Sequence, residues 1–178
     1  SWLLESRDVK CDSFASGEAF IAALPALPQD LPSCIILDIR MGAGMSGIEL
    51  FQRMPEIAHQ WPVIFLSGHG DITLAVTAVK HGAFDFLEKP FADNQLVDRV
   101  LEALKLSKQR LSSFNQSEVI RDKLNLLSPR ELDVMDGILS GQANRDIAND
   151  LGMAVRTVEV HRASIFKKMN VKGAVELI

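Results

Sequence analysis

Short apolar runs bounded by turn-forming residues recur in the first half of the chain and predict strands. Such runs are typical of strands that are buried on both faces of a sheet. They cover residues 33–38, 63–66 and 85–89, and an alternating run predicts a further strand at residues 9–14. Helical spacing lies between them, at residues 17–24, 47–54 and 71–81, with Asp71 in a first turn. This alternation predicts an α/β fold, a doubly wound parallel sheet with right-handed crossovers.

The second half of the chain is predicted to be entirely helical. A long helical pattern begins at Asp93, and the polar residues 112–117 are typical of a linker. Ser128-Pro129-Arg130-Glu131 is a capping box with proline at the first helical position, so a new helix begins there. Two more helices follow at residues 144–151 and 155–169. Two short helices around a glycine turn, followed by a basic third helix, predict a helix-turn-helix.

Composition is typical of a globular protein inside the cell. The chain has 178 residues, 47% of them hydrophobic, which suits one or two domains with substantial cores. No apolar run approaches the roughly 20 residues needed to cross a bilayer, and no signal-peptide pattern is present, so we expect a cytoplasmic protein without a membrane partner. Cys11 and Cys34 make no disulfide framework and are expected to be buried apolar thiols.

Charge is unevenly spread along the chain. The net charge is -4, yet residues 1–120 carry 10 Lys and Arg against 15 Asp and Glu, and residues 153–178 carry 5 against 2. An acidic first half with a basic end suggests a regulatory domain joined to a nucleic-acid-binding domain.

Three polar side chains, Asp38, Ser67 and Lys89, follow successive predicted strands. Because the carboxyl ends of parallel strands share one edge of the sheet, we expect these side chains to lie together. An aspartate carboxylate is ionised at neutral pH and can attack phosphorus to form an acyl phosphate, while lysine supplies a compact positive charge. Singly, each has an ordinary interpretation as a turn, cap or solvated residue. Together they favour a phosphoryl site.

Residues 1–104 resemble a response-regulator receiver domain. The resemblance is carried by three motifs in the family's order and spacing, Leu37–Met41, Ser67–Asp71 and Gly82–Phe91. It implies that Asp38 is the phosphoacceptor, Ser67 the hydroxyl that contacts the phosphoryl group and Phe86 the switch aromatic. It further implies that Lys89 is the lysine typical of the family and that the Lys89–Pro90 bond is cis. It also implies a Mg²⁺ cofactor and a sensor histidine kinase as partner.

The start of the chain departs from the receiver pattern. Receivers begin with a strand followed by an acidic pair that holds Mg²⁺, whereas this chain opens inside what would be the first helix. Only Asp38 and the backbone carbonyl of Arg40 are left as candidate metal ligands. We therefore expect an N-terminally incomplete receiver with weak Mg²⁺ binding and poor phosphorylation. Residues 9–14 would lose their neighbour, and the sheet would expose an unpaired edge.

Residues 127–178 resemble the LuxR-type DNA-binding domain, the output domain of FixJ/NarL regulators. The closest correspondence lies in Leu127–Glu131 and Thr157–Arg162. With a helical linker at residues 105–126, the whole chain resembles the FixJ-like two-component response regulators. This implies a transcription regulator rather than an enzyme. Phosphorylation of Asp38 would pair two receivers into a homodimer and gate binding to double-stranded DNA.

Helical spacing assigns the faces of the third helix of this domain. One stripe, expected to pack on the first two helices, contains Val158, His161, Ile165 and Met169. On the opposite stripe, Glu159 can accept from cytosine N4, and Val160 and Ala163 can touch thymine methyl groups. Thr157 is a further DNA-contact candidate, and candidates for the phosphates are Arg156, Arg162, Lys167 and Lys168.

Two alternative functions are compatible with parts of the pattern. Phosphatases of the haloacid-dehalogenase type also place a nucleophilic aspartate at a strand end, but they carry a second aspartate two residues later, where this chain has Arg40. A DNA-binding factor that works without phosphorylation is the other alternative, because the acidic pair is absent from the sequence.

Overall fold

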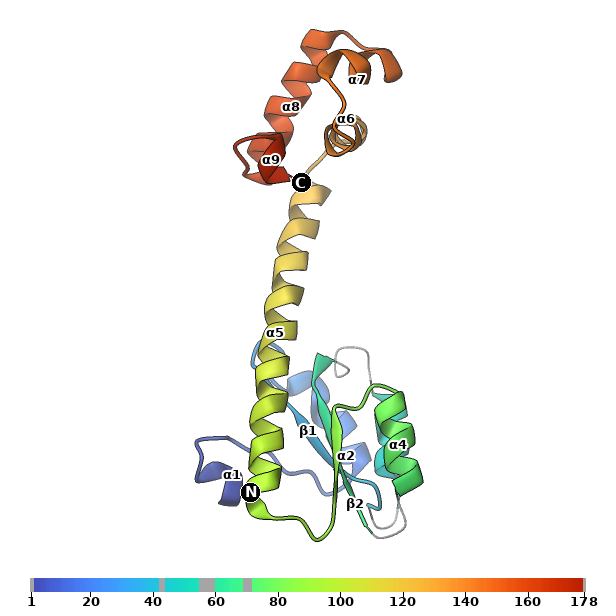
Figure 1. The fold of residues 1–178 in the computed structure, drawn as a ribbon, viewed down its shortest axis with the longest axis vertical. Helices are drawn as coiled ribbons and strands as arrows, with labels where there is room; N and C mark the ends of the chain where they lie inside the picture. Colours follow the sequence, from blue (N-terminus) through green and yellow to red (C-terminus); the bar gives the residue numbers. More distant parts are fainter. Residues whose placement is uncertain (1, 42–43, 55–59, 69–71, 178) are drawn as a thin grey trace. The chain divides into compact units, whose positions relative to one another are not determined.

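The computed structural model describes residues 2–41, 44–54, 60–68 and 72–177, and it divides into two compact units (Figure 1). Unit 1 covers Ser1–Ser113 and unit 2 covers Phe114–Ile178. Each unit has a hydrophobic core of its own, and we describe each by itself.

Unit 1 is built on a parallel sheet, which confirms the predicted fold class. Its strands, in the spatial order β1-β2-β3, are β1 (Ile35–Asp38), β2 (Val63–Ser67) and β3 (Asp85–Glu88). Each strand is followed in sequence by a helix, namely α3 (Gly47–Arg53), α4 (Ile72–Lys80) and α5 (Asp93–Asn125). Asp71, expected in the first turn of α4, lies outside the described residues.

Both faces of this sheet are covered, which explains why its strands are continuously apolar. Val63 and Phe65 point into a core that contains Phe20 of α2 (Gly17–Ala23) and Leu50 of α3. Ile64, between them, points into a second core formed with α5 on the other face. Ile64 and Phe65 are both 0% exposed. Apolar residues at consecutive positions are what a strand covered on both sides requires.

The predicted strand at residues 9–14 is not a strand in the structure. The segment runs without regular hydrogen-bonded structure after α1 (Trp2–Glu5), although Val9 and Cys11 still pack against the α5 side of the sheet. Within the described residues, β1 pairs only with β2, so this segment has no neighbouring strand to bond. Alternation of apolar residues cannot by itself make a strand when the backbone groups lack a ladder partner.

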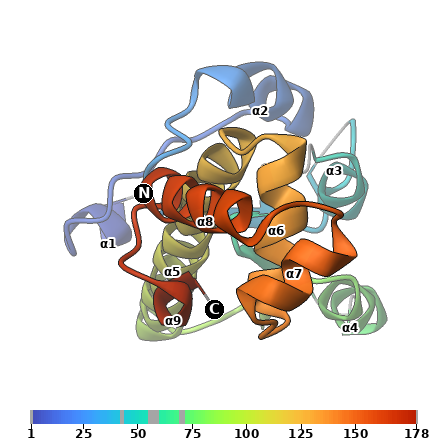
Figure 2. The ribbon, with the colours of Figure 1, turned by 90° about the horizontal axis from the view of Figure 1, so that it is seen from above.

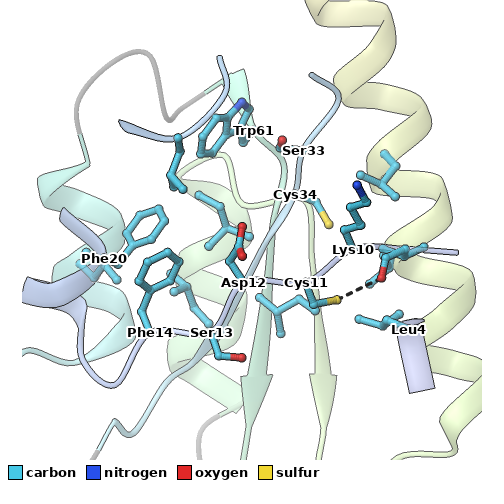
Figure 3. A pocket seen from close by; sticks show the side chains of 18 of the residues that line it. Leu4, Lys10, Cys11, Asp12, Ser13, Phe14, Phe20, Ser33, Cys34 and Trp61 are labelled. Atoms are coloured by element: carbon cyan, nitrogen blue, oxygen red, sulfur yellow. Dashed lines mark hydrogen bonds between the residues drawn. The ribbon is translucent and has the colours of Figure 1, made fainter. Parts of the chain in front are cut away.

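A groove of about 440 Å³ follows the free edge of β1 (Figure 3). The irregular segment Val9–Phe14 and the residues Cys34–Leu37 both line it, together with Val100 and Leu104 of α5. Cys11 and Cys34 are free thiols at the groove and are partly rather than fully buried, which corrects the prediction. Burial raises the pKa of Cys34 to about 11, so its thiol is protonated at neutral pH.

Two smaller differences concern helix ends. The helix predicted at residues 17–24 ends at Ala23, and Pro25 lies in the short 3₁₀ turn η1 (Leu24–Ala26). This follows from the proline ring, which removes a donor and disfavours continuation of the helix. Residues 112–117 remain helical within α5, because polar side chains on an exposed helix do not interrupt its backbone bonds. No helix in the described ranges has the length and apolarity to cross a membrane.

Unit 2 contains the predicted helix-turn-helix. After α5 come α6 (Pro129–Leu139), α7 (Asn144–Asp150), α8 (Val155–Met169) and the short α9 (Ala174–Leu177). The helix α8 packs on both α6 and α7 (Figure 2). The capping box of Ser128 and Glu131 forms as predicted. Where α6 and α7 meet, a Cβ on Gly137 would lie 2.7 Å from Ile147 Cγ1, so a larger residue would force the Ile147 side chain to move.

These differences in packing predict that unit 1 unfolds before unit 2. In the part of unit 1 that the structure describes, β1 has a strand on one side and a groove on the other, whereas the core helices of unit 2 pack on each other. Both tryptophans, Trp2 and Trp61, belong to unit 1, so their fluorescence reports on this unit alone. In urea, we expect the fluorescence to change at a lower concentration than the last part of the circular dichroism signal. A single transition common to both signals would contradict this prediction.

Candidate functional site

The parallel sheet brings Asp38, Ser67 and Lys89 to one edge, as predicted. Asp38 is the last residue of β1 and Ser67 the last of β2, and Lys89 follows β3 directly. The backbone holds this arrangement, since Ile39 N donates to Leu66 O at 2.9 Å and Lys89 N donates to Ser67 O at 2.8 Å. The three side chains therefore come from strand ends that are hydrogen-bonded to each other.

Asp38 and Lys89 form an ion pair across this edge. Lys89 Nζ donates to Asp38 Oδ2, and Arg40 N donates to Asp38 Oδ1 at 3.1 Å. The side chains of Asp38 and Lys89 are 37% and 43% exposed, respectively, so a molecule in the solvent can reach the Asp38 carboxylate. The peptide bond between Lys89 and Pro90 is cis, which confirms that prediction.

The side chain of Ser67 is buried, and that of Phe86 is partly buried. Ser67 is 0% exposed, and its hydroxyl donates to Leu87 O at 3.4 Å. Phe86 is partly buried and packs against the core that contains Phe65. The hydroxyl thus has a backbone partner of its own here, and the aromatic ring lies against the sheet.

Gly47 fixes the backbone beneath Asp38. A Cβ at this position would lie 2.2 Å from Asp38 O, and Gly47 N donates to Ile39 O at 3.1 Å. Gly47 begins α3, which is capped by the reciprocal hydrogen bonds of Ser46 and Glu49. Neither feature was predicted from the sequence, although the Ser-x-x-Glu spacing is a visible signal for the cap.

The described residues do not form a complete metal site. No group of three or more His, Cys, Asp or Glu side chains within the described ranges is placed to hold a metal ion. Of the two predicted ligands, Asp38 provides a carboxylate whose oxygens already accept from Lys89 and Arg40. Mg²⁺ prefers an octahedral shell with one or two carboxylates, several waters and phosphate oxygens. Asp38 and the carbonyl of Arg40 could therefore supply part of that shell but not all of it.

The two faces of α8 are as the helical spacing predicted. Val158 and Ile165 are 0% exposed and Met169 is 9% exposed, and all three belong to the core of unit 2. His161 is partly buried beside them. The exposed side includes Val160, which is 59% exposed, and the other exposed candidates are Arg156, Thr157, Glu159, Ala163 and Lys167.

Contacts on the exposed side of α8 refine the predicted roles. Arg156 Nη1 donates to Glu159 Oε2 at 2.9 Å, so the proposed base-reading carboxylate already has a partner. Arg162 is partly buried, and its guanidinium lies 5.4 Å from the centre of the Phe166 ring. Both arginines therefore have local partners on their own helix.

Lys168 has a partner within unit 2 that the sequence did not reveal. Its ammonium donates to Glu131 Oε2 at 2.7 Å, so it faces α6. Glu131 also accepts from Ser164 Oγ at 2.6 Å. The hydrogen bonds from Lys168 and then Ser164 lower the pKa of Glu131 to about 2. The sequence identified Glu131 only as a capping residue, because its contacts with α8 lie more than thirty residues away along the chain.

Unit 1 thus has an aspartate–lysine pair at the carboxyl edge of a parallel sheet, and unit 2 has a helix-turn-helix with an exposed third helix. This combination defines a receiver domain joined to a DNA-binding output domain. The family model for the response regulator receiver domain matches residues 1–101, and the model for the luxR family of bacterial regulatory proteins matches residues 125–178.

Relatives match this chain along nearly all of its length. The transcriptional regulatory protein FixJ of Bradyrhizobium diazoefficiens is 38% identical over 100% of this chain and 85% of its own length. DctR of Rhodobacter capsulatus, a C4-dicarboxylate transport regulator, is 42% identical over 99% of this chain and 88% of its own. The solved structure of the response regulator StyR matches with a TM-score of 0.83 and 35% identity, covering 98% of this chain and 86% of that one. The chain belongs to the FixJ-like two-component response regulators.

Gly47→Ala is predicted to disturb the edge of the sheet at Asp38. The added methyl group overlaps the Asp38 carbonyl, which is backbone and cannot turn aside, so we expect a loss of about 1–3 kcal/mol in the stability of unit 1. Tryptophan fluorescence during urea unfolding measures this loss. Gly17→Ala in the same unit is the control, because the methyl group that it adds would lie 3.3 Å from the end of the Leu50 side chain rather than 2.2 Å from backbone. Equal and small effects of the two substitutions would show that the close approach is not a constraint.

Proposed function

We propose that Asp38 is the residue that receives the phosphoryl group in this response regulator. The observation that carries the proposal is the ion pair of Asp38 with Lys89 at the accessible edge of the sheet. A carboxylate oxygen attacks phosphorus, and the bond between phosphorus and the donor breaks, with the electron pair leaving on the donor. In the sensor kinase that a receiver domain implies, this donor is a phosphohistidine nitrogen. Lys89 offsets the negative charge of the incoming group.

Mg²⁺ supplies further charge compensation in receiver domains generally. At this site we propose that Asp38 and the carbonyl of Arg40 contribute to its shell, with phosphate oxygens and water as further ligands.

We propose that Ser67 and Phe86 convert the modification into a change of surface. Ser67 donates to Leu87 O in this structure and has to give up that bond to reach a phosphoryl oxygen on Asp38. Phe86 lies on the same strand as Leu87 and follows into the space that the hydroxyl leaves. The surface over residues 72–89 changes as a result, and two receivers pair through it. A local charge that biases a packed element between two arrangements is a common design of such switches.

The output domain is proposed to read the major groove with α8. Glu159, Val160 and Ala163 are exposed on the stripe that can face base edges, and their chemistry suits cytosine and thymine. Arg156, Thr157, Arg162 and Lys167 are proposed to contact DNA chiefly through its backbone. Two output domains joined by receiver pairing bind a two-part site more tightly than one, because the second binding event becomes intramolecular.

Asp38→Asn is predicted to abolish dimerisation in response to a phosphodonor. The full-length protein should become dimeric with a small-molecule phosphodonor and Mg²⁺, as measured by light scattering, while the variant stays monomeric because the amide cannot form the acyl phosphate. Asp30→Asn is the matched control, since Asp30 is an exposed aspartate of unit 1 outside the strands. Equal dimerisation of Asp38→Asn and the parent would favour a regulator that works without phosphorylation.

Substitutions on α8 are predicted to separate base reading from phosphate contact. Glu159→Ala and Val160→Ala should change the selected base sequence and cost about 1–3 kcal/mol on the preferred site. Lys167→Ala should instead weaken binding to all sequences alike and lower the salt slope by about one unit. Binding-site selection, followed by affinity measurements across salt concentrations, distinguishes the two classes. If neither Glu159→Ala nor Val160→Ala changed the selected sequence, α8 would not be the reading helix.

A further inference from the structure

The carboxylate of Glu131 is buried at the start of α6, where the residue is 4% exposed. It accepts three hydrogen bonds, from Ser128 N at 2.7 Å, Ser164 Oγ at 2.6 Å and Lys168 Nζ at 2.7 Å. Ser164 and Lys168 are one turn apart on α8, so this network joins the first turn of α6 to the second half of α8. A buried carboxylate is tolerated only when its charge is compensated and hydrogen-bonded, so the three donors are held in place.

Lys167 and Lys168 are neighbours in sequence but have different surroundings. Lys167 is exposed and forms no ion pair with any residue that the structure describes, while the Lys168 side chain is 35% exposed and bonded to Glu131. Consecutive residues of an α-helix point about 100° apart, so one of the two can face α6 while the other faces DNA. A lysine whose charge is already neutralised within the protein releases few counterions from DNA.

We propose that Glu131 is a positioning residue for DNA binding. Through Ser164 and Lys168 it fixes the rotation of α8 about its own axis and keeps the charge of Lys168 away from the phosphates. Lys167 is then the one lysine of this adjacent pair that contributes to DNA affinity. The inference rests on the proposed reading role of α8 and adds a role for a buried residue that does not itself touch DNA.

The first test removes both members of the ion pair together. Replacing a buried pair as a unit leaves no uncompensated charge, so the double variant Glu131→Gln with Lys168→Met should stay folded, which circular dichroism checks. Affinity of the full-length protein for a mixed-sequence DNA duplex is measured across a range of salt concentrations. We expect the salt slope of the double variant to equal that of the parent. Lys167→Met, the matched control, should lower the slope by about one unit.

A slope that falls by about one unit in the double variant would show that Lys168 contacts phosphate, and would overturn the inference. If Lys167→Met also left the slope unchanged, Lys167 would not contact phosphate. That result would remove a contact assigned in the proposed function as well as contradict this inference.

The second test releases Lys168 by changing Glu131 alone. In Glu131→Gln the ammonium of Lys168 loses its anionic partner, so the salt slope should rise by about one unit, and adding Lys168→Met should return it to the parental value. A purely structural role for Glu131 would lower affinity at every salt concentration without raising the slope. That result, or a slope that is unaffected by adding Lys168→Met, contradicts the inference. If Glu131→Gln alone is unfolded, the double variant of the first test decides the question.

Discussion

Three parallel strands that end at the same edge of a sheet are the constraint that places Asp38, Ser67 and Lys89 together. The register pairs Asp38 with Leu66 and Ser67 with Glu88, so Asp38, Ser67 and Lys89 lie at one edge although about fifty residues separate the first from the last. Burial of β2 on both faces makes this register strict, because a shift by one residue would turn Phe65 and Ile64 to the wrong cores. The packing of the sheet and the geometry of the site therefore have a single cause.

The output domain depends on a different kind of constraint, a buried charge. Its helices meet through an apolar core, but such a core tolerates small rotations of α8 that would turn the exposed stripe away from a groove. Glu131 adds directional bonds to Ser164 and Lys168, and these specify one orientation. The low pKa of Glu131, about 2, has a consequence for stability. Its contribution is present above the ordinary glutamate value of 4.5 and is lost as the pH falls toward 2.

Much of this architecture could be predicted from the sequence, because the signals are local. Continuous apolar runs indicated β1, β2 and β3, the capping box indicated α6, and helical spacing separated the buried Val158 and Ile165 from the exposed Val160. What could not be predicted depends on contacts between residues far apart in the chain, which local patterns do not show. Residues 9–14 alternate like a strand but lack a ladder partner within the described residues. Local patterns also could not reveal the ion pair of Lys168 with Glu131, which lies 37 residues earlier in the chain.

If Asp38 receives the phosphoryl group as proposed, chemical trapping of the acyl phosphate should detect it at this residue. Borohydride reduces an aspartyl phosphate to homoserine, which is stable enough to be located by peptide mass spectrometry. After incubation of the full-length protein with a small-molecule phosphodonor and Mg²⁺, we expect homoserine at residue 38 and at no other aspartate. Homoserine at a different aspartate, or none at residue 38 while the protein still responds to the donor, would contradict it.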